Sequence, residues 1–146
     1  MAEQDDVADS PTGWVAKHVQ RYVASNGRNG HIWYGKPTLL LVTTGRKTKA
    51  LRRTALIYGE DGENFVVVGS NGGSDDHPNW YLNLRAEPRV QVQVGAERFE
   101  AVARVASGDE RDRLWEQMAG IFPQYRSYRK KTKREIPVVV LQPTHA

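Results

Sequence analysis

Cysteine is absent from the 146 residues of the chain, so disulfide bonds and thiolate metal sites are both excluded. Long apolar runs are missing as well, and the first residues lack the pattern of a signal peptide. We therefore expect a cytoplasmic protein. The length suits one domain, and it is enough to bury a hydrophobic core without disulfide bonds.

Several motifs that carry chemistry are also missing. The four histidines show no ligand spacing with carboxylates, so we expect no metal site. Neither the G-x-x-x-x-G-K-[ST] phosphate loop nor a strand-linked G-x-G-x-x-G occurs, and there is no G-x-S-x-G nucleophile elbow. The chain also lacks an obvious pair of carboxylates at buried positions. These absences argue against the commonest routes to nucleotide binding, ester hydrolysis and acid–base catalysis.

Charge is plentiful but unevenly spread. The net charge of +4 and the isoelectric point near 9.5 favour an anionic partner. The first nine residues are acidic, and we expect them to be frayed. Positive charge gathers in residues 46–53 and again in residues 126–134, where six residues are basic. Two basic segments so far apart in sequence could face one another across a groove.

Hydrophobic periodicity predicts about six strands and three to four helices. The strands are joined mostly by hairpins and do not alternate regularly with helices. This order favours a small antiparallel barrel, mainly β with flanking helices, over a doubly wound parallel sheet. Strands are expected at 38–44, 54–59, 65–70, 89–94, 99–105 and 136–141, and helices at 12–24, 78–86 and 108–121.

Local signals add detail to the second and third helices. Asp75 or Asp76 can cap the second helix. Ser107 and Glu110 fit a capping box for the third helix. The stripe that we expect to be buried on the third helix comprises Leu114, Met118, Ile121 and Phe122. The face that we expect to be shared on the preceding strand comprises Phe99, Ala101, Ala103 and Val105.

The stretch TTGRKTKALRRT, residues 43–54, joins two apolar strands with five basic residues and no acid. Like charges this close repel one another unless water or an anion offsets them. Gly45 permits a tight turn, which can point backbone N–H groups outward as an anion nest. Arginine, moreover, binds phosphate or carboxylate through two parallel hydrogen bonds. The stretch is therefore either a solvated hairpin or a site for an elongated polyanion.

A second candidate is GSNGGSDDHPNWYLNL, residues 69–84. Its glycines allow a flat ring to lie against the chain and to be held by main-chain hydrogen bonds. The alternative is a loop followed by a capped helix whose Trp80 and Leu84 belong to the core. For the aromatic residues alone, the core role is favoured.

A third candidate is FPQYRSYRKKTKR, residues 122–134. Tyr125 and Tyr128 are three residues apart, so on a helix they share a face. Their hydroxyls could line a pocket or donate hydrogen bonds to a substrate. The alternative is a solvated basic turn with half-packed tyrosines.

Together the three segments resemble the deazaflavin-dependent nitroreductase family of actinobacteria, which are split β-barrel oxidoreductases using coenzyme F420. The resemblance rests on LLLVTTGRKTKALRRTALIY, VVVGSNGGSDDHPNWYLNLRAEPRVQVQV and FPQYRSY…REIPVVVLQP, and it covers residues 30–143. It implies a split β-barrel cofactor-binding domain at 30–146, preceded at 1–29 by an acidic tail and a short amphipathic helix. Departures from the family pattern occur at Phe122, Asn71 and Ile57.

The coenzyme of that family carries a phosphodiester and a glutamate tail, a polyanion that would offset the repulsion within 43–54. The resemblance implies that the basic turn holds the phosphate and the tail, and that the stretch from Val68 to Asn71 runs along the ring. The implied cofactor-binding residues are Arg46, Lys47, Thr48, Arg52, Arg53, Thr54, Ala55, Leu56, Ile57, Val68, Gly69, Ser70, Asn71, Asn79, Trp80, Tyr81, Leu82, Asn83 and Tyr125.

The implied reaction is hydride transfer from reduced coenzyme F420 to an electron-poor acceptor, which is a quinone, an enone or lactone, or a nitro compound. The implied catalytic residues are Ser70, Tyr125 and Tyr128, as hydrogen-bond or proton donors to the acceptor oxygen. An F420 carrier without turnover and an FMN-binding split-barrel protein remain alternatives. A nucleic acid is not expected as a partner, because exposed aromatics do not interleave the basic turn. Any weak peripheral association with the inner face of the cell membrane would involve the helix at 12–24.

Overall fold

The computed structural model describes residues 7–9, 32–33 and 36–144 of the chain. The predicted helix at 12–24 and most of the acidic tail lie outside the described residues. The strands are β1 (Val7–Asp9), β2 (Ile32–Trp33), β3 (Lys36–Thr44), β4 (Leu51–Ile57), β5 (Gly59–Asp61), β6 (Asn64–Val68), β7 (Arg89–Val94), β8 (Glu97–Val105) and β9 (Val138–Pro143). The helices are α3 (Asn79–Ala86), α4 (Gly108–Ile121) and α5 (Gln124–Lys131), and a short 3₁₀ turn, η1 (Asn71–Gly73), precedes α3.

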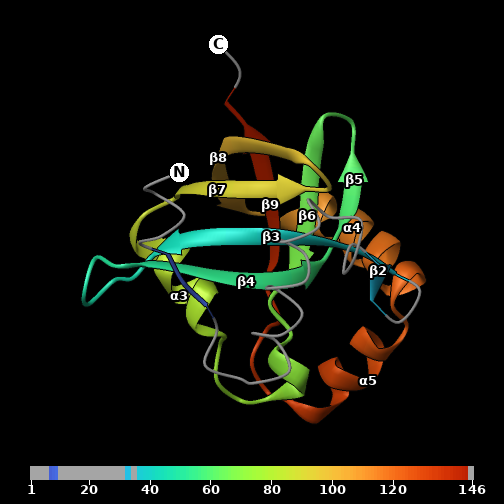
Figure 1. Cartoon of the computed structure of the whole chain (residues 1–146). Helices are drawn as coiled ribbons and strands as arrows, with labels where there is room; N and C mark the ends of the chain where they lie inside the picture. Colours follow the sequence, from blue (N-terminus) through green and yellow to red (C-terminus); the bar gives the residue numbers. More distant parts are fainter. Residues whose placement is uncertain (1–6, 10–31, 34–35, 145–146) are drawn as a thin grey trace.

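One curled sheet contains the nine described strands (Figure 1). Its strand order is β1-β4-β3-β7-β8-β9-β6-β5, and β2 pairs with β3 beside this path. The pairings are antiparallel except that of β1 with β4, which places Asp9 in a strand rather than in a frayed tail. Within the described residues β1 and β5 end the order without pairing with each other. The predicted antiparallel barrel is therefore confirmed in its split form.

The inner core lies against one face of this sheet. Alternation along β7 buries Val90 and Val92, as the pattern RVQVQV predicts. On β8 Ala101 and Ala103 of the expected face are buried, and Val105, which pairs opposite Val139, continues this face but is 40% exposed at the end of the strand. The buried members of the inner core are Leu39, Leu41, Tyr58, Val67, Tyr81, Leu84, Val90, Val92, Ala101, Ala103, Val139 and Leu141.

The opposite face of β6 and β9 is covered by α4, and α5 packs against α4 below the sheet (Figure 1). The side chains buried between these elements form an outer cluster. Helix α4 has the predicted bounds. Of its expected stripe, Leu114 and Met118 are fully buried, while Ile121 and Phe122 are half-buried and pack against the same cluster. The stripe is wider than expected, because Trp115 and Ala119 are buried too. The buried members of the outer cluster are Val66, Val68, Ala106, Leu114, Trp115, Met118, Tyr125, Ile136, Val138 and Val140.

The predicted helix caps are wrong. Pro78, not an aspartate, precedes α3, and the Asp75 carboxylate instead accepts a hydrogen bond from Thr132 Oγ1 at 2.9 Å. Ser107 precedes α4 without a side-chain cap, and Glu110 instead forms a two-pronged pair with Arg104. In both cases a partner outside the helix takes the side chain that the local pattern assigned to the cap. Among the described helices, none has the length and apolar character needed to cross a membrane.

Candidate functional site

The basic turn between β3 and β4 is closed by two backbone hydrogen bonds, Gly45 N–H to Ala50 O at 2.7 Å and Lys49 N–H to Gly45 O at 2.8 Å. A Cβ atom at position 45 would lie 3.0 Å from the Ala50 carbonyl oxygen, so the predicted tight turn is confirmed and favours glycine there. Lys47, Thr48 and Lys49 are exposed. The turn therefore presents two ammonium groups and a hydroxyl to solvent.

Arg46 is the residue of the turn that contacts α3. Its Nη1 donates to Asn83 Oδ1 at 2.9 Å, its backbone N–H donates to the same oxygen at 3.2 Å, and its Nη2 donates to Asn79 Oδ1 at 3.5 Å. The buried Asn83 amide is fixed in turn, because its Nδ2 donates to Thr43 Oγ1 at 3.3 Å. Within the described part of the chain no carboxylate pairs with Arg46, so nothing there neutralises its charge.

β4 begins at Leu51, three residues before the predicted start, so Arg52 and Arg53 lie in a strand rather than in the turn. Consecutive strand side chains point to opposite faces, and these two arginines therefore cannot both face one ligand. The edge of β4 away from β3 pairs with β1 only at 51–53. Among the described strands none pairs with that edge at 54–57. The half-buried side chains of this edge are Thr54, Ala55 and Leu56.

The loop between β6 and α3 turns sharply at its start. Gly69 donates its N–H to Pro137 O at 2.9 Å, and a Cβ atom on it would lie only 2.8 Å from the proline ring. Ser70 has helical backbone angles, φ −72° and ψ −35°, and Asn71 follows with a φ of +47° in the left-handed region. This succession turns neighbouring N–H groups to one side, as in an anion nest. Among the described residues no acceptor binds the N–H of Ser70 or of Asn71.

Arg134 is the residue of this region that the sequence did not point to. Its guanidinium donates to the carbonyl oxygens of Gly69, Ser70 and Ser74 at 3.1, 2.9 and 2.9 Å. In the sequence it is one of six basic residues in 126–134. No local signal distinguishes it, because its partners lie 57 to 65 residues earlier in the chain.

His77 links Arg134 to α3. Arg134 Nη1 lies 3.1 Å from His77 Nδ1, and a guanidinium can only donate, so the imidazole accepts there and carries its proton on Nε2. Burial lowers the pKa of His77, and the charges of Arg134 and Arg85 lower it further. The ring also packs against Tyr81 on α3, with 4.7 Å between centroids. The loop is thus attached to the first turn of the helix through a neutral histidine.

The two tyrosines of the third segment lie on α5 and share a face, as predicted. Tyr125 is only 5% exposed and packs against Phe122, with 5.0 Å between ring centroids, and against Trp115. Burial raises the pKa of Tyr125, so its phenol stays protonated at neutral pH. Tyr128 is half-buried, and its hydroxyl donates to Gln124 Oε1 at 3.3 Å. The catalytic roles of both tyrosines stay predictions.

The three candidate segments meet around residues 69–83. The basic turn reaches this stretch through Arg46 and α3, and the second basic segment reaches it through Arg134. The backbone of α5 also approaches it, since a Cβ atom on Gly73 would lie 3.1 Å from Tyr128 Cα. In Figure 1 the turn and α3 lie at the left, while η1 and α5 lie at the lower right. The two basic segments therefore flank one stretch of chain.

The predicted site residues of α3 divide between core and surface. Tyr81 and Asn83 are buried, while Trp80 and Leu82 are half-buried and pack against the inner core. Asn79 is exposed. The packing of the aromatic rings agrees with the core role that the sequence favoured, and the amides of Asn79 and Asn83 are the groups of α3 that contact the basic turn.

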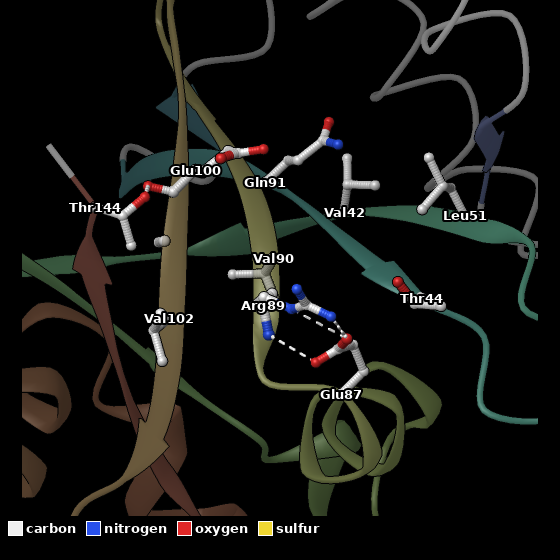
Figure 2. A pocket seen from close by; sticks show the side chains of 11 residues that line it. Val42, Thr44, Leu51, Glu87, Arg89, Val90, Gln91, Glu100, Val102 and Thr144 are labelled. Atoms are coloured by element: carbon white, nitrogen blue, oxygen red, sulfur yellow. Dashed lines mark hydrogen bonds and ion pairs between the residues drawn. The ribbon is translucent and has the colours of Figure 1, made fainter. Parts of the chain in front are cut away.

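A separate hollow of about 370 Å³ lies on the outer side of β7 and β8 (Figure 2). An ion pair of Glu87 with Arg89, 2.6 Å long, stands at one side of it. None of the predicted site residues lines this hollow. In the described part of the chain, moreover, no group of three or more His, Asp or Glu is arranged to hold a metal ion. Val42, Thr44, Leu51, Glu87, Arg89, Val90, Gln91, Glu100, Ala101, Val102 and Thr144 line the hollow.

Comparison with known sequences identifies related proteins. The profile of a family described as F420H(2)-dependent quinone reductase matches residues 14–143. An F420H(2)-dependent quinone reductase of Mycobacterium tuberculosis is 40% identical over 141 residues, which cover 88% of this chain and 95% of that protein.

Solved structures extend the comparison to the fold. The structure of an F420-H2 dependent reductase matches with a TM-score of 0.68 and 36% identity. The match covers 73% of this chain and 94% of the chain in that structure. A chain described as a domain-swapped dimer matches with a TM-score of 0.71 and 34% identity. The match covers 91% of this chain and 100% of that chain. A pyridoxamine 5'-phosphate oxidase-like protein of Listeria innocua, with a TM-score of 0.53 and 13% identity, shares the split-barrel fold alone.

Proposed function

Because the chain belongs to the F420H(2)-dependent quinone reductase family, we propose that it reduces a quinone with reduced coenzyme F420 bound between the basic turn 45–50, α3 and the loop that follows β6. The chain is an oxidoreductase, and its coenzyme is the reduced deazaflavin. The observation that carries the proposed position is the Arg46 guanidinium, which two neutral amides hold in place without cancelling its charge.

The donors of the turn suit the phosphodiester and carboxylates of such a coenzyme. Arg46 is already oriented by Asn83, so little side-chain entropy is lost when it binds an anion. Exposed Lys47 and Lys49 supply further positive charge, and Thr48 supplies a hydroxyl. A set of separated cations fits an extended polyanion better than a single compact one.

The start of the loop suits a flat ring. Gly69 lets the backbone turn tightly against Pro137, and the N–H groups of Ser70 and Asn71 that follow are without acceptors in the described part of the chain. The half-buried edge of β4 at 54–57 supplies a second backbone wall. These groups can hold ring oxygens and nitrogens while excluding water from one side.

The reduced deazaflavin supplies the hydride when bound, and the chain orients both reactants. The Ser70 hydroxyl is half-buried beside two N–H donors, so it can donate to an oxygen on which negative charge grows. A protonated Tyr125 could do the same only after its ring leaves the outer cluster, since it is 5% exposed. Tyr128 is the more accessible of the two phenols.

The family name supports a quinone as the acceptor. Enones, lactones and nitro compounds stay predictions, as does a weak association with membrane surfaces. A panel of these acceptors and flotation with anionic vesicles would test each of them.

Turnover with purified protein tests the proposal. Reduced F420 and menadione should yield the absorbance of oxidised deazaflavin at a rate that scales with protein concentration. Binding of F420 without turnover on any acceptor would favour the carrier alternative. Tighter binding of FMN than of F420 in calorimetry would favour the FMN-binding alternative.

A further inference from the structure

One side chain of the second basic segment holds the loop at which the proposed ring site lies. The Arg134 guanidinium donates to three backbone carbonyls within Gly69–Ser74 and to the ring of His77. A planar fork with fixed N–H directions can reach these acceptors together only when the loop has one conformation. A lysine has the same charge but lacks the fork.

The segment that carries Arg134 is itself fixed. The backbone N–H of Arg134 donates to Thr132 Oγ1 at 3.3 Å, and that hydroxyl donates to Asp75 in the loop. Three residues further on, Pro137 O accepts the N–H of Gly69 at 2.9 Å. The loop and this segment are thus joined at several points, and the guanidinium of Arg134 makes the largest number of these contacts.

The carbonyls that Arg134 contacts determine which N–H groups it affects. The Gly69 carbonyl belongs to the same peptide unit as the Ser70 N–H, and the Ser70 carbonyl belongs to that of the Asn71 N–H. A cation bound to a carbonyl oxygen polarises the peptide unit and makes its N–H a stronger donor. Both of these N–H groups are without an acceptor in the described part of the chain.

We propose that Arg134 is a positioning residue of the coenzyme site, which fixes and polarises the N–H groups of Ser70 and Asn71 as donors to an oxygen of the bound deazaflavin ring. This inference rests on the proposed function above. It assigns to one arginine of the C-terminal basic segment a role that its exposed neighbours Lys130 and Lys133 do not share.

Hydrogen exchange of the ligand-free protein tests the first half of the proposal. Arg134→Lys should speed exchange of the Gly73 and Ser74 amides, which close the η1 turn, by roughly tenfold, while amides of α4 stay unchanged. The matched control is Arg111→Lys, because Arg111 donates to Ile136 O at 2.6 Å from the other side of the same segment. Equal exchange in wild type and Arg134→Lys would overturn the inference.

Coenzyme titration tests the second half. We expect Arg134→Lys to raise the Kd for oxidised F420 by roughly tenfold, because the donor geometry is lost. The dependence of the Kd on salt concentration should keep its slope, because the charge is kept. In Arg111→Lys the Kd should stay within about twofold of the wild type. Coenzyme binding by the wild type together with an unchanged Kd in Arg134→Lys would overturn this inference alone. Failure of the wild type to bind F420 would overturn the proposed function and this role with it.

Discussion

Arg46 and Arg134 reach the same stretch of chain, residues 69–83, from two different basic segments, but their guanidinium groups meet different partners. Arg46 contacts the side-chain amides of Asn79 and Asn83. Arg134 contacts backbone carbonyls and a neutral histidine. Both side chains are half-buried, so exposure does not separate the two, and only their partners do.

The comparison indicates how one residue type can serve binding in one place and conformation in another. Four N–H···acceptor contacts of Arg134 are made to the loop, so few donors remain for a ligand. Arg46 has two such side-chain contacts, and its turn neighbours Lys47 and Lys49 add charge that is open to solvent. Arg46 should therefore contribute most to the affinity for the coenzyme, and Arg134 should contribute most to the stability of the loop conformation.

The largest expected effect is on stability. Arg134→Met should lower the free energy of unfolding by roughly 2–3 kcal/mol, because the guanidinium contacts to the Gly69, Ser70 and Ser74 carbonyls are all lost together. Arg46→Met should cost less than about 1 kcal/mol, since Asn83 Oδ1 keeps the backbone N–H of residue 46 as a donor and the exposed Asn79 can bind water. Urea denaturation of both variants at neutral pH measures the difference. Equal losses would contradict the division of roles.

Coenzyme affinity should depend more on the basic turn than on the basic segment near the C-terminus. Arg46→Ala and Lys47→Ala should each weaken binding of F420 by roughly 1.5–3 kcal/mol, the range for hydrogen bonds to charged groups. Lys133→Ala, in the other basic segment, is the matched control and should leave the affinity unchanged. Fluorescence titration gives the three constants. Unchanged affinity in both turn variants would identify the turn as a solvated hairpin.

Patterns that depend on neighbouring residues were predicted well from the sequence. Strand β7 and helix α4 have the predicted bounds because alternation and helical periodicity are both strong there. The tight turn at Gly45 was also predicted, because the need for a residue without a Cβ atom depends only on the neighbouring residues of the turn. The predicted start of β4 was too late, because two consecutive arginines, Arg52 and Arg53, are typical of an exposed turn. In the structure both residues pair with β3 and belong to the strand.

Features that depend on distant partners were missed. The cap of α3 was assigned from local spacing, yet Thr132, 57 residues further along the chain, takes the carboxylate of Asp75. Arg134 was missed because a basic run contains no sign of which member will meet backbone carbonyls. Such pairings arise only after the sheet has brought segments far apart in sequence together.

A smaller effect is expected on the salt dependence of binding. The exposed ammonium groups of Lys47 and Lys49 should contribute by screened attraction, so replacing both with alanine should flatten the dependence of Kd on ionic strength. The change at physiological salt should be under about 1 kcal/mol for Lys49. Replacing Lys130 and Lys133 together is the control and should leave the slope as it is. An equal flattening in the control would mean that the polyanion contacts both basic segments.

The smallest expected effect is a pH dependence from His77. Its pKa is lower in the folded protein than in the unfolded chain, so the unfolded chain binds its proton first as the pH falls. Its contribution to stability is therefore fully present above the unfolded pKa of about 6.5 and is lost as the pH falls through the lower folded pKa. His77→Gln keeps an acceptor for Arg134 but does not titrate. The Tm of this variant should fall less steeply than that of the wild type between about pH 7.5 and 5, while the carboxylates titrate alike in both. Parallel curves would show that protonation of His77 does not compete with its contact to Arg134, and the loop would then depend on the three carbonyl contacts alone.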